Sequence, residues 1–195
     1  LDAAIFCLVE TDLEVRNLIF DHFRATETRM IVTSANPEQR TILEINAEPA
    51  AEEYARIVGV PMASLSPLVF SGHPLLVHMG GRYFVRAIRE QTADGGLSLM
   101  SSIDTGAVMS LGLAENLTEG FEAMLRDLPS TPSLILSFDC ILRRLAVEHA
   151  GLGATIQQIF SRYNVAGFNT YGEQHSGMHV NQTFVGLAFL DPAVP

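Results

Sequence analysis

Short apolar runs alternate with polar segments along this chain, and their spacing predicts both strands and helices. Ala3 to Val9 (AAIFCLV) is typical of a buried strand. Arg29 to Thr33 and Arg40 to Ile45 predict the two strands of a hairpin. Pro49 marks a helix start, and Ala50 to Val58 places apolar residues on one face of that helix before a glycine ends it.

The second half of the chain predicts an antiparallel meander followed by amphipathic helices and closing strands. Leu75 to Arg86 alternates in the manner of a strand pair around Gly80-Gly81. The other predicted elements are strands at Leu97 to Ile103, Leu134 to Phe138, Val165 to Thr170 and Thr183 to Leu190, and helices at Asn116 to Leu128 and Ala154 to Tyr163. We therefore expect an α+β (mixed α/β) fold with a largely antiparallel sheet and a few packed amphipathic helices.

Composition excludes several classes of function. All 12 basic residues are arginines and stand against 22 acidic residues, so the formal net charge of -10 disfavours nucleic acid as a partner. The absence of lysine removes Schiff-base catalysis, pyridoxal attachment and the phosphate-binding lysine of nucleotide loops. No GxSxG or HExxH motif is present. We therefore expect a protein that is not an enzyme.

Cysteine usage and hydropathy predict the compartment. Cys7 and Cys140 lie far apart, which argues against a disulfide scaffold and favours a reducing cytoplasm. The longest apolar runs are well short of the roughly 20 residues that a membrane span requires, so we expect no membrane association. Because the chain starts at Leu1 rather than Met, we expect it to be a piece of a longer protein.

Polar side chains concentrate between the two closing strands, in the run VAGFNTYGEQHSGMHVNQTFVGLAFL from Val165 to Leu190. Loops held by rigid strands commonly contact ligands. A solvent-exposed hairpin loop with glycine turns is the alternative interpretation, and the residues themselves leave both open.

The run NTYGEQHSGMHVNQTFVG resembles the C-terminal signature of FIST proteins, particularly the bacterial nitric-oxide-sensing NosP-like branch. Supporting runs follow in the same order: DHFRATETRMIVTSANPEQR, EINAEPAAEEYARIVGV, HPLLVHMGGRYFVRAI and FDCILRR. The resemblance implies that residues 1–46 are the tail of the FIST N-terminal region and that residues 47–192 are the FIST C-terminal domain. It further implies an intracellular small-ligand sensor that regulates a histidine kinase or a cyclic-di-GMP enzyme, either a diguanylate cyclase or a phosphodiesterase.

The haem of the NosP-like branch directs attention to the histidines. His179 is the first candidate for the axial ligand to haem iron, because it lies in the family-like run and imidazole is the common proximal donor. The alternative for His179 is a loop histidine that bonds its neighbours. His22 is the second candidate ligand. Cys140 could supply a thiolate, although a small buried residue is the commoner role for such a cysteine.

Arginines supply the other candidate contacts. Arg143 and Arg144 could bind an anionic group such as a carboxylate or a haem propionate, or could form an ordinary ion pair with Glu148. A second hypothesis is a sensor of an amino acid or a similar small metabolite. The residues that would bind the polar ends of this ligand are Arg143, Arg144, Tyr171, Glu173 and Asn181. A third hypothesis is a docking domain or homodimer without its own ligand, which would associate through its amphipathic helices.

Overall fold

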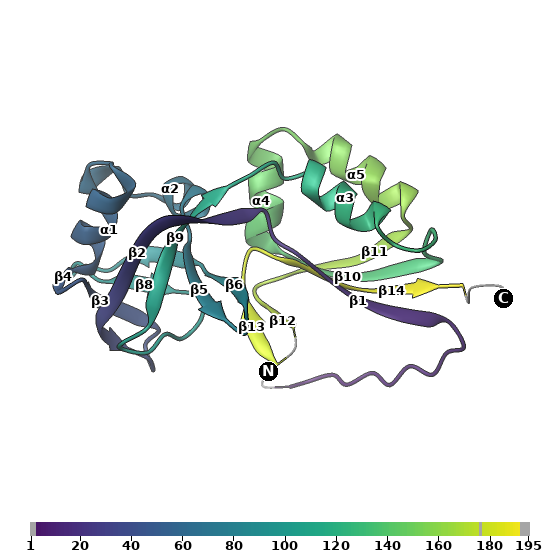
Figure 1. Cartoon of the computed structure of the whole chain (residues 1–195), viewed down its shortest axis with the longest axis horizontal. Helices are drawn as coiled ribbons and strands as arrows, with labels where there is room; N and C mark the ends of the chain where they lie inside the picture. The colour runs from purple at the N-terminus through teal and green to yellow at the C-terminus, as the bar shows by residue number, and fades with distance from the viewer. Residues whose placement is uncertain (1–2, 176, 192–195) are drawn as a thin grey trace.

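The computed structural model describes residues 3–175 and 177–191, which form two lobes side by side (Figure 1). Strands predominate, most of them are antiparallel, and helices cover parts of both lobes. The predicted α+β fold is therefore confirmed. Among the described residues, no helix combines the length and the apolar character that a membrane crossing would need.

The first lobe is built on an eight-stranded antiparallel sheet with the order β6-β5-β9-β2-β3-β8-β7, and β4 lies beside β3. Helix α1 packs against β3, and α2 packs against β7 and β9. The strands are β2 (Phe23–Asn36), β3 (Thr41–Ile45), β4 (Glu48–Pro49), β5 (Leu75–Met79), β6 (Arg82–Arg86), β7 (Ile88–Gln91), β8 (Leu97–Leu99) and β9 (Val108–Ala114). The helices are α1 (Ala50–Val58), the 3-10 turn η1 (Met62–Ser64) and α2 (Pro67–Gly72).

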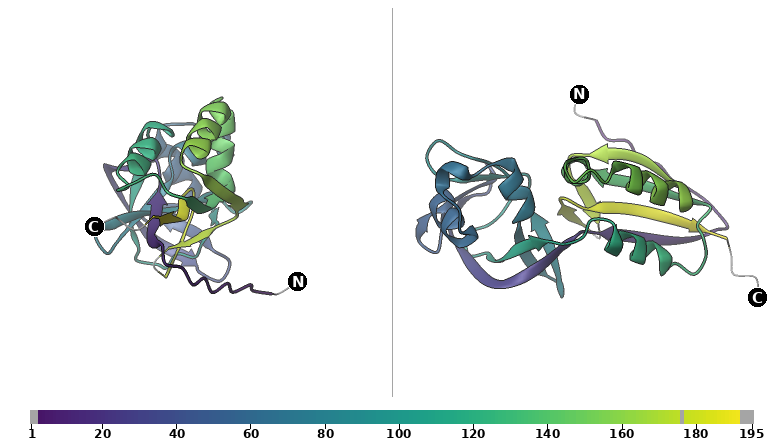
Figure 2. Two further views of the ribbon diagram at one scale, coloured as in Figure 1. Left: turned by 90° about the vertical axis from the view of Figure 1, so that its right-hand side faces the viewer. Right: turned by 90° about the horizontal axis from the view of Figure 1, so that it is seen from above.

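The second lobe is a four-stranded sheet with the order β1-β14-β10-β11 and three helices on one face (Figure 2). Its strands are antiparallel except for the parallel pair β10 and β11. The strands are β1 (Glu14–Phe20), β10 (Leu134–Cys140), β11 (Val165–Thr170) and β14 (Phe184–Leu190). The helices are α3 (Glu119–Arg126), α4 (Ile141–His149) and α5 (Gly153–Arg162). A small hairpin of β12 (Glu173–His175) and β13 (Met178–Val180) interrupts the chain between β11 and β14.

Local signals account for the helices that the sequence predicts. Helix α1 has the predicted bounds, because Pro49 precedes it and Gly59 ends it in the left-handed conformation at φ 81°. Helix α3 starts later than predicted, since the Asn116 side chain accepts hydrogen bonds from the backbone N–H groups of Thr118 and Glu119 ahead of the first turn. The predicted hairpin between β2 and β3 and the Gly80-Gly81 turn between β5 and β6 are both confirmed.

The predicted buried strand at Ala3 to Val9 is wrong. This segment is extended but belongs to no strand in the described structure, and Ile5, Phe6 and Leu8 are 94–99% exposed. The apolar pattern indicates a need for burial, which the described part of the chain does not satisfy. The predicted strand at Leu97 to Ile103 is also shorter than expected and ends at Leu99.

Each lobe has its own apolar core. Residues 1–46 and residues 47–192 both contribute strands to each lobe. In the first lobe, Ile42, Tyr54 and Leu97 are fully buried between the sheet and α1. In the second lobe, Phe121 of α3 packs between the rings of Phe20, Phe160 and Phe184, with centroids 4.8–6.0 Å apart. Strand β1 pairs with β14 and strand β2 with β9, so residues before and after residue 47 share both sheets.

Replacement of Phe121 tests this core. Phe121→Ala removes a fully buried ring that contacts three other rings, and we expect it to lower the free energy of unfolding by about 3–5 kcal/mol. Met62→Ala, at a half-exposed position in the other lobe, is the matched control and should change it by less than about 0.5 kcal/mol. Urea denaturation measures both. A cost below about 1 kcal/mol for Phe121→Ala would contradict this packing.

Candidate functional site

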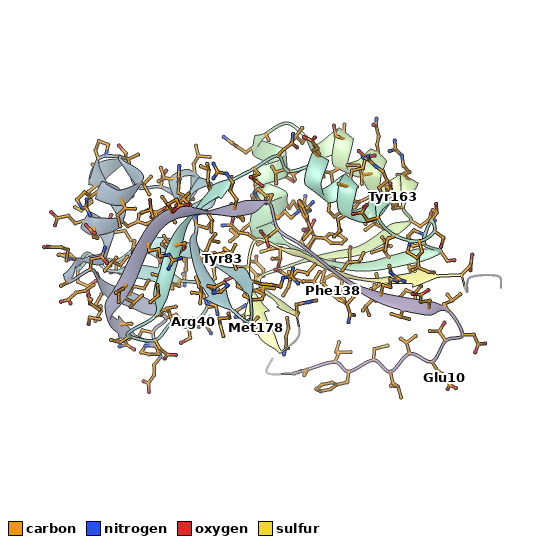
Figure 3. The ribbon with its side chains drawn as sticks, viewed as in Figure 1. Glu10, Arg40, Tyr83, Phe138, Tyr163 and Met178 are labelled. Carbon is orange, nitrogen blue, oxygen red and sulfur yellow. The ribbon has the colours of Figure 1, made fainter. Side chains whose placement is uncertain are left out.

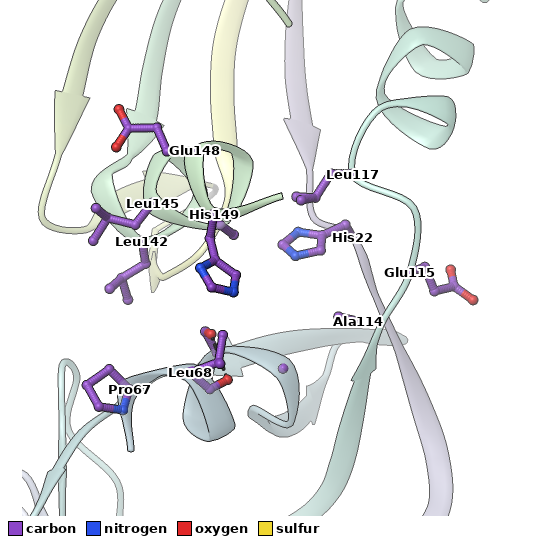
Figure 4. A pocket seen from close by; sticks show the side chains of 13 residues that line it. His22, Pro67, Leu68, Ala114, Glu115, Leu117, Leu142, Leu145, Glu148 and His149 are labelled. Atoms are coloured by element: carbon purple, nitrogen blue, oxygen red, sulfur yellow. Dashed lines mark hydrogen bonds between the residues drawn. The ribbon is translucent and has the colours of Figure 1, made fainter. Parts of the chain in front are cut away.

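A cavity of about 570 Å³ lies where the two lobes meet (Figure 4). Helix α2 of the first lobe forms one wall with Leu68, and α4 of the second lobe forms the opposite wall with Leu142 and Leu145. The crossing segments between the lobes complete it with His22 and Leu117. We call this space the hinge cavity. Its walls are largely apolar, which is typical of pockets for small molecules or cofactors.

Two chain crossings position this cavity. The chain passes between the lobes once from β1 to β2 and again from β9 to α3 (Figure 2). The two crossings bond to each other, since the backbone N–H of Glu115 donates to the carbonyl oxygen of His22 at 2.7 Å. His22 therefore lies at the junction between the two lobes.

The His22 side chain is held uncharged at the wall of the hinge cavity. Burial, reinforced by the positive charge of Arg143, lowers the pKa of His22 to about 4. Its ring packs on Phe23 with centroids 4.0 Å apart, and Nδ1 is buried without a hydrogen-bond partner in the described chain. Buried polar atoms normally have a partner, so Nδ1 of His22 is an unsatisfied group next to the hinge cavity.

Arg143 lies behind this wall and is fully buried. Its Nη1 donates to Asp139 Oδ2 at 2.7 Å, and its guanidinium carbon lies 4.6 Å from the centroid of the Phe121 ring. Burial raises the pKa of Asp139 despite the opposing effect of Arg143. Within the described residues, Nε and Nη2 of Arg143 and Oδ1 of Asp139 have no hydrogen-bond partner. The Nε and Nη2 atoms form the edge that binds a carboxylate bidentately.

Arg144 has a different environment from its neighbour in sequence. Its Nε forms an ion pair with Glu148 Oε1 at 2.8 Å, and its Nη1 donates to Asn169 Oδ1 at 3.0 Å. About half of both charged side chains is exposed to solvent. Arg144 thus forms the surface ion pair that was its alternative role, and neither Arg143 nor Arg144 is among the residues that line the hinge cavity.

The polar run between β11 and β14 folds into the hairpin of β12 and β13 instead of an open loop. Glu173 is buried at its base, where it accepts hydrogen bonds from the hydroxyl groups of Thr170 and Thr183, and burial raises its pKa. Asn181 is fully buried next to it, whereas the Tyr171 side chain is 84% exposed. The five residues that the sequence predicts to bind an amino acid therefore do not surround one cavity. They are Arg143, Arg144, Tyr171, Glu173 and Asn181.

His179 lies on β13 and is absent from the residues that line the hinge cavity. Its imidazole lies over Gly172, where an added Cβ would come within 2.1 Å of Nε2. Its carbonyl oxygen accepts a hydrogen bond of 3.2 Å from Nη1 of Arg86, on β6 of the other lobe. Burial, with the charges of Arg86 and Arg40, lowers the pKa of His179. His179 therefore bonds its neighbours in a second contact between the lobes.

The remaining candidates supply no metal site. Burial raises the pKa of the Cys140 thiol to about 11, so the thiolate form is disfavoured at neutral pH. Across residues 3–175 and 177–191, no group of three or more histidine, cysteine, aspartate or glutamate side chains is arranged to hold a metal ion. A single imidazole, such as that of His22 or His179, would have to be the protein's donor to any haem iron.

Comparison with protein families gives two matches. The model of the FIST N domain matches residues 1–48, and the model of the FIST C domain matches residues 50–176. This chain belongs to the FIST family. FIST domains are generally described as small-ligand sensors of signal transduction. No curated protein and no solved structure matches the chain.

The sequence directed attention to the FIST signature around His179, whereas the structure places the hinge cavity elsewhere. Leu68 of α2 and Leu145 of α4 line this cavity from positions far apart in the FIST C domain. The sequence analysis missed α2, although Ser66 followed by Pro67 is a helix-start signal, and the Ser66 hydroxyl does accept a hydrogen bond from the Val69 N–H. Nothing in the local sequence shows that α2 and α4 face each other.

The buried neutral state of His22 predicts a pH dependence of stability. Because the pKa of His22 falls from 6.5 in the unfolded chain to about 4 in the folded chain, the unfolded state binds the proton more tightly between these values. The contribution of His22 is fully present above about pH 7 and is lost as the pH falls towards 4, by about 3 kcal/mol.

Urea denaturation of the wild type and of His22→Gln at neutral and acidic pH measures this effect. Other carboxyl groups also titrate in this range, so the quantity to compare is the difference between the two proteins. We expect the wild type to lose more stability on acidification than the variant. Equal losses in the two proteins would show that His22 is not buried in its neutral form.

Proposed function

We propose that this FIST chain senses a small ligand in the hinge cavity and transmits its binding as a change in the angle between the lobes. The buried, neutral His22 on the wall of this cavity is the observation that carries the proposal. A ligand there touches α2 of one lobe and α4 of the other, together with the crossing segments. Any ligand that binds one lobe arrangement more tightly shifts the population towards it.

Haem is the specific ligand that we propose, with His22 as its axial donor in preference to His179. The neutral imidazole and the walls formed by Leu68, Leu142 and Leu145 suit an iron porphyrin. Glu115 and Glu148 are acidic, and none of the residues described as lining the cavity is an arginine. The haem propionates would therefore have to point towards solvent. A bound haem supplies an iron at which nitric oxide can coordinate, as the resemblance to the NosP-like branch implies.

The proposed signal leaves the site through the contacts between the lobes. His22 and Glu115 bond at the crossing, and Arg86 bonds the carbonyl of His179 on the hairpin. A change in the angle at the first contact has to be accommodated at the second, because both join the same two lobes. We propose a cytoplasmic signalling protein as the receiver, such as a histidine kinase, a diguanylate cyclase or a phosphodiesterase.

A metabolite that carries a carboxylate, such as an amino acid, is the second candidate ligand. The Nε and Nη2 edge of Arg143 favours it, because this edge is buried, charged and without a hydrogen-bond partner in the described chain. Arg143 does not line the hinge cavity, so a carboxylate would reach this edge only if the wall between the cavity and Arg143 moved. Arg144, Tyr171, Glu173 and Asn181 have no part in this version of the proposal.

Titration with haem followed by visible absorption tests the first candidate. We expect the wild-type chain to give a Soret band typical of histidine ligation, and His22→Ala to weaken haem binding at least about tenfold because the axial bond is lost. His179→Ala is the matched control, since it removes a histidine that lies outside the hinge cavity. It should leave the band and the affinity unchanged.

The other outcomes separate the candidates. Loss of the band in His179→Ala with retention in His22→Ala would overturn the assignment of His22. If the wild type gives no band, haem is excluded and calorimetry with a panel of amino acids tests the second candidate. In that case the binding heat should disappear in His22→Ala, and a panel that gives no heat with the wild type would reject the carboxylate ligand as well.

A further inference from the structure

The four-stranded sheet of the second lobe has one face under α3, α4 and α5 and a second face that the described helices do not cover (Figure 1). Cross-strand register shows which residues share this second face, because directly paired residues point to the same side. Val15 pairs with Phe189, and Phe138 pairs with both Val185 and Phe168. We call this surface the open face and define it by Val15, Leu134, Phe138, Phe168, Val185 and Leu187.

The open face is apolar and carries no charged side chain on its four described strands. The polar residues among its strand positions are Asn17 and Thr170. Phe168 is 62% exposed, and Val15 and Leu134 are exposed as well. Contiguous apolar patches of this kind mark interaction surfaces in soluble proteins. The whole chain has a net charge of -10, so two copies repel each other over most of their surface. The open face lacks charged side chains, and two copies could therefore approach through it without local repulsion.

An exposed apolar arm lies on the same side of the sheet as the open face (Figure 1). Ala3–Val9 runs below the sheet, outside its strands, and Phe138 lies on the side of the sheet that faces this segment (Figure 3). Successive side chains of the arm are apolar on both sides of the extended backbone, as in strands that are buried on both faces. The residues Glu10 to Leu13 connect it directly to the edge strand β1. The arm and the open face thus expose apolar side chains on the same side of the sheet.

We propose that two copies of this chain pack through their open faces, with the arm of each copy covering the rim of the other. Two apolar sheet faces pack at a separation of about 10 Å, and the same surface on both partners gives a closed two-fold dimer. Strand spacing and rise give each open face an area of roughly 450 Å². Two faces bury about 900 Å², which falls short of the roughly 1,200–2,000 Å² of a stable interface, so the arms are needed to reach it.

The sequence suggested the amphipathic helices as a dimer surface, and their apolar residues pack within the lobe. Phe121 and Leu125 of α3 and Ile156 and Ile159 of α5 are buried against the helix-covered face of the sheet. Their apolar stripes are therefore already used within the lobe. Val15, Leu134 and Phe168 of the open face remain exposed to solvent together with the arm, whereas Phe138, Val185 and Leu187 lie beside Gln174 and His175 of the small hairpin.

Analytical ultracentrifugation of the 195-residue chain over about two decades of concentration tests the proposal. We expect a reversible equilibrium between monomer and dimer. Phe168→Glu places a charge in the apolar contact and should raise the dimer Kd at least about tenfold. Met62→Glu, at a similarly exposed apolar position in the other lobe, is the matched control and should leave the Kd unchanged.

Deletion of Ala3–Val9 is the second variant, and it should also raise the dimer Kd at least about tenfold. The deletion removes exposed residues outside the folded lobes, so we expect this variant to fold. Its dimer Kd therefore tests the proposal even if Phe168→Glu does not fold. Three results would overturn the proposal: a strict monomer throughout, a Kd unchanged by both variants, or open-ended aggregation. Protection of the open face from hydrogen exchange under conditions where the chain is monomeric would also overturn it.

Discussion

The guanidinium of Arg143 connects most elements of the second lobe. It extends from α4, bonds Asp139 on β10, lies over the ring of Phe121 on α3, and is 5.7 Å from the ring centroids of Phe20 on β1 and Phe184 on β14. A buried cation of this kind is tolerated only with its carboxylate in place, since loss of one partner from such a pair typically costs about 3–5 kcal/mol. The positions of these helices and strands are therefore mutually dependent.

The charge of Arg143 also reaches the hinge between the lobes. It adds to burial in lowering the pKa of His22, and so helps to present a neutral imidazole to a cavity with apolar walls. The same histidine bonds the second chain crossing through its carbonyl oxygen. Packing in one lobe, the chemistry of the cavity and the geometry of the hinge thus converge on His22. A ligand that contacts this residue would act on all three, which is what a sensor requires.

Local features of the fold were predictable, and features that depend on distant contacts were not. Helix α1 has the predicted bounds because the signals at its ends are local. Ala3–Val9 has the apolar pattern of a buried strand, but burial needs a partner surface that the pattern does not identify. The hinge cavity joins Leu68 to Leu145, and only the tertiary fold brings them together. His179 was preferred to His22 because it lies in the family-like run, whereas the burial of His22 arises from three-dimensional packing.

Hydrogen–deuterium exchange with and without haem tests the central claim most directly, because it locates the ligand along the chain. The account predicts slower exchange in α2, in the crossing segments around His22 and Glu115, and in α4. Exchange in the distant helix α1 should stay unchanged. Protection confined to the hairpin of β12 and β13, with no change in α2 or α4, would contradict the account and place the ligand at the family-like run around His179.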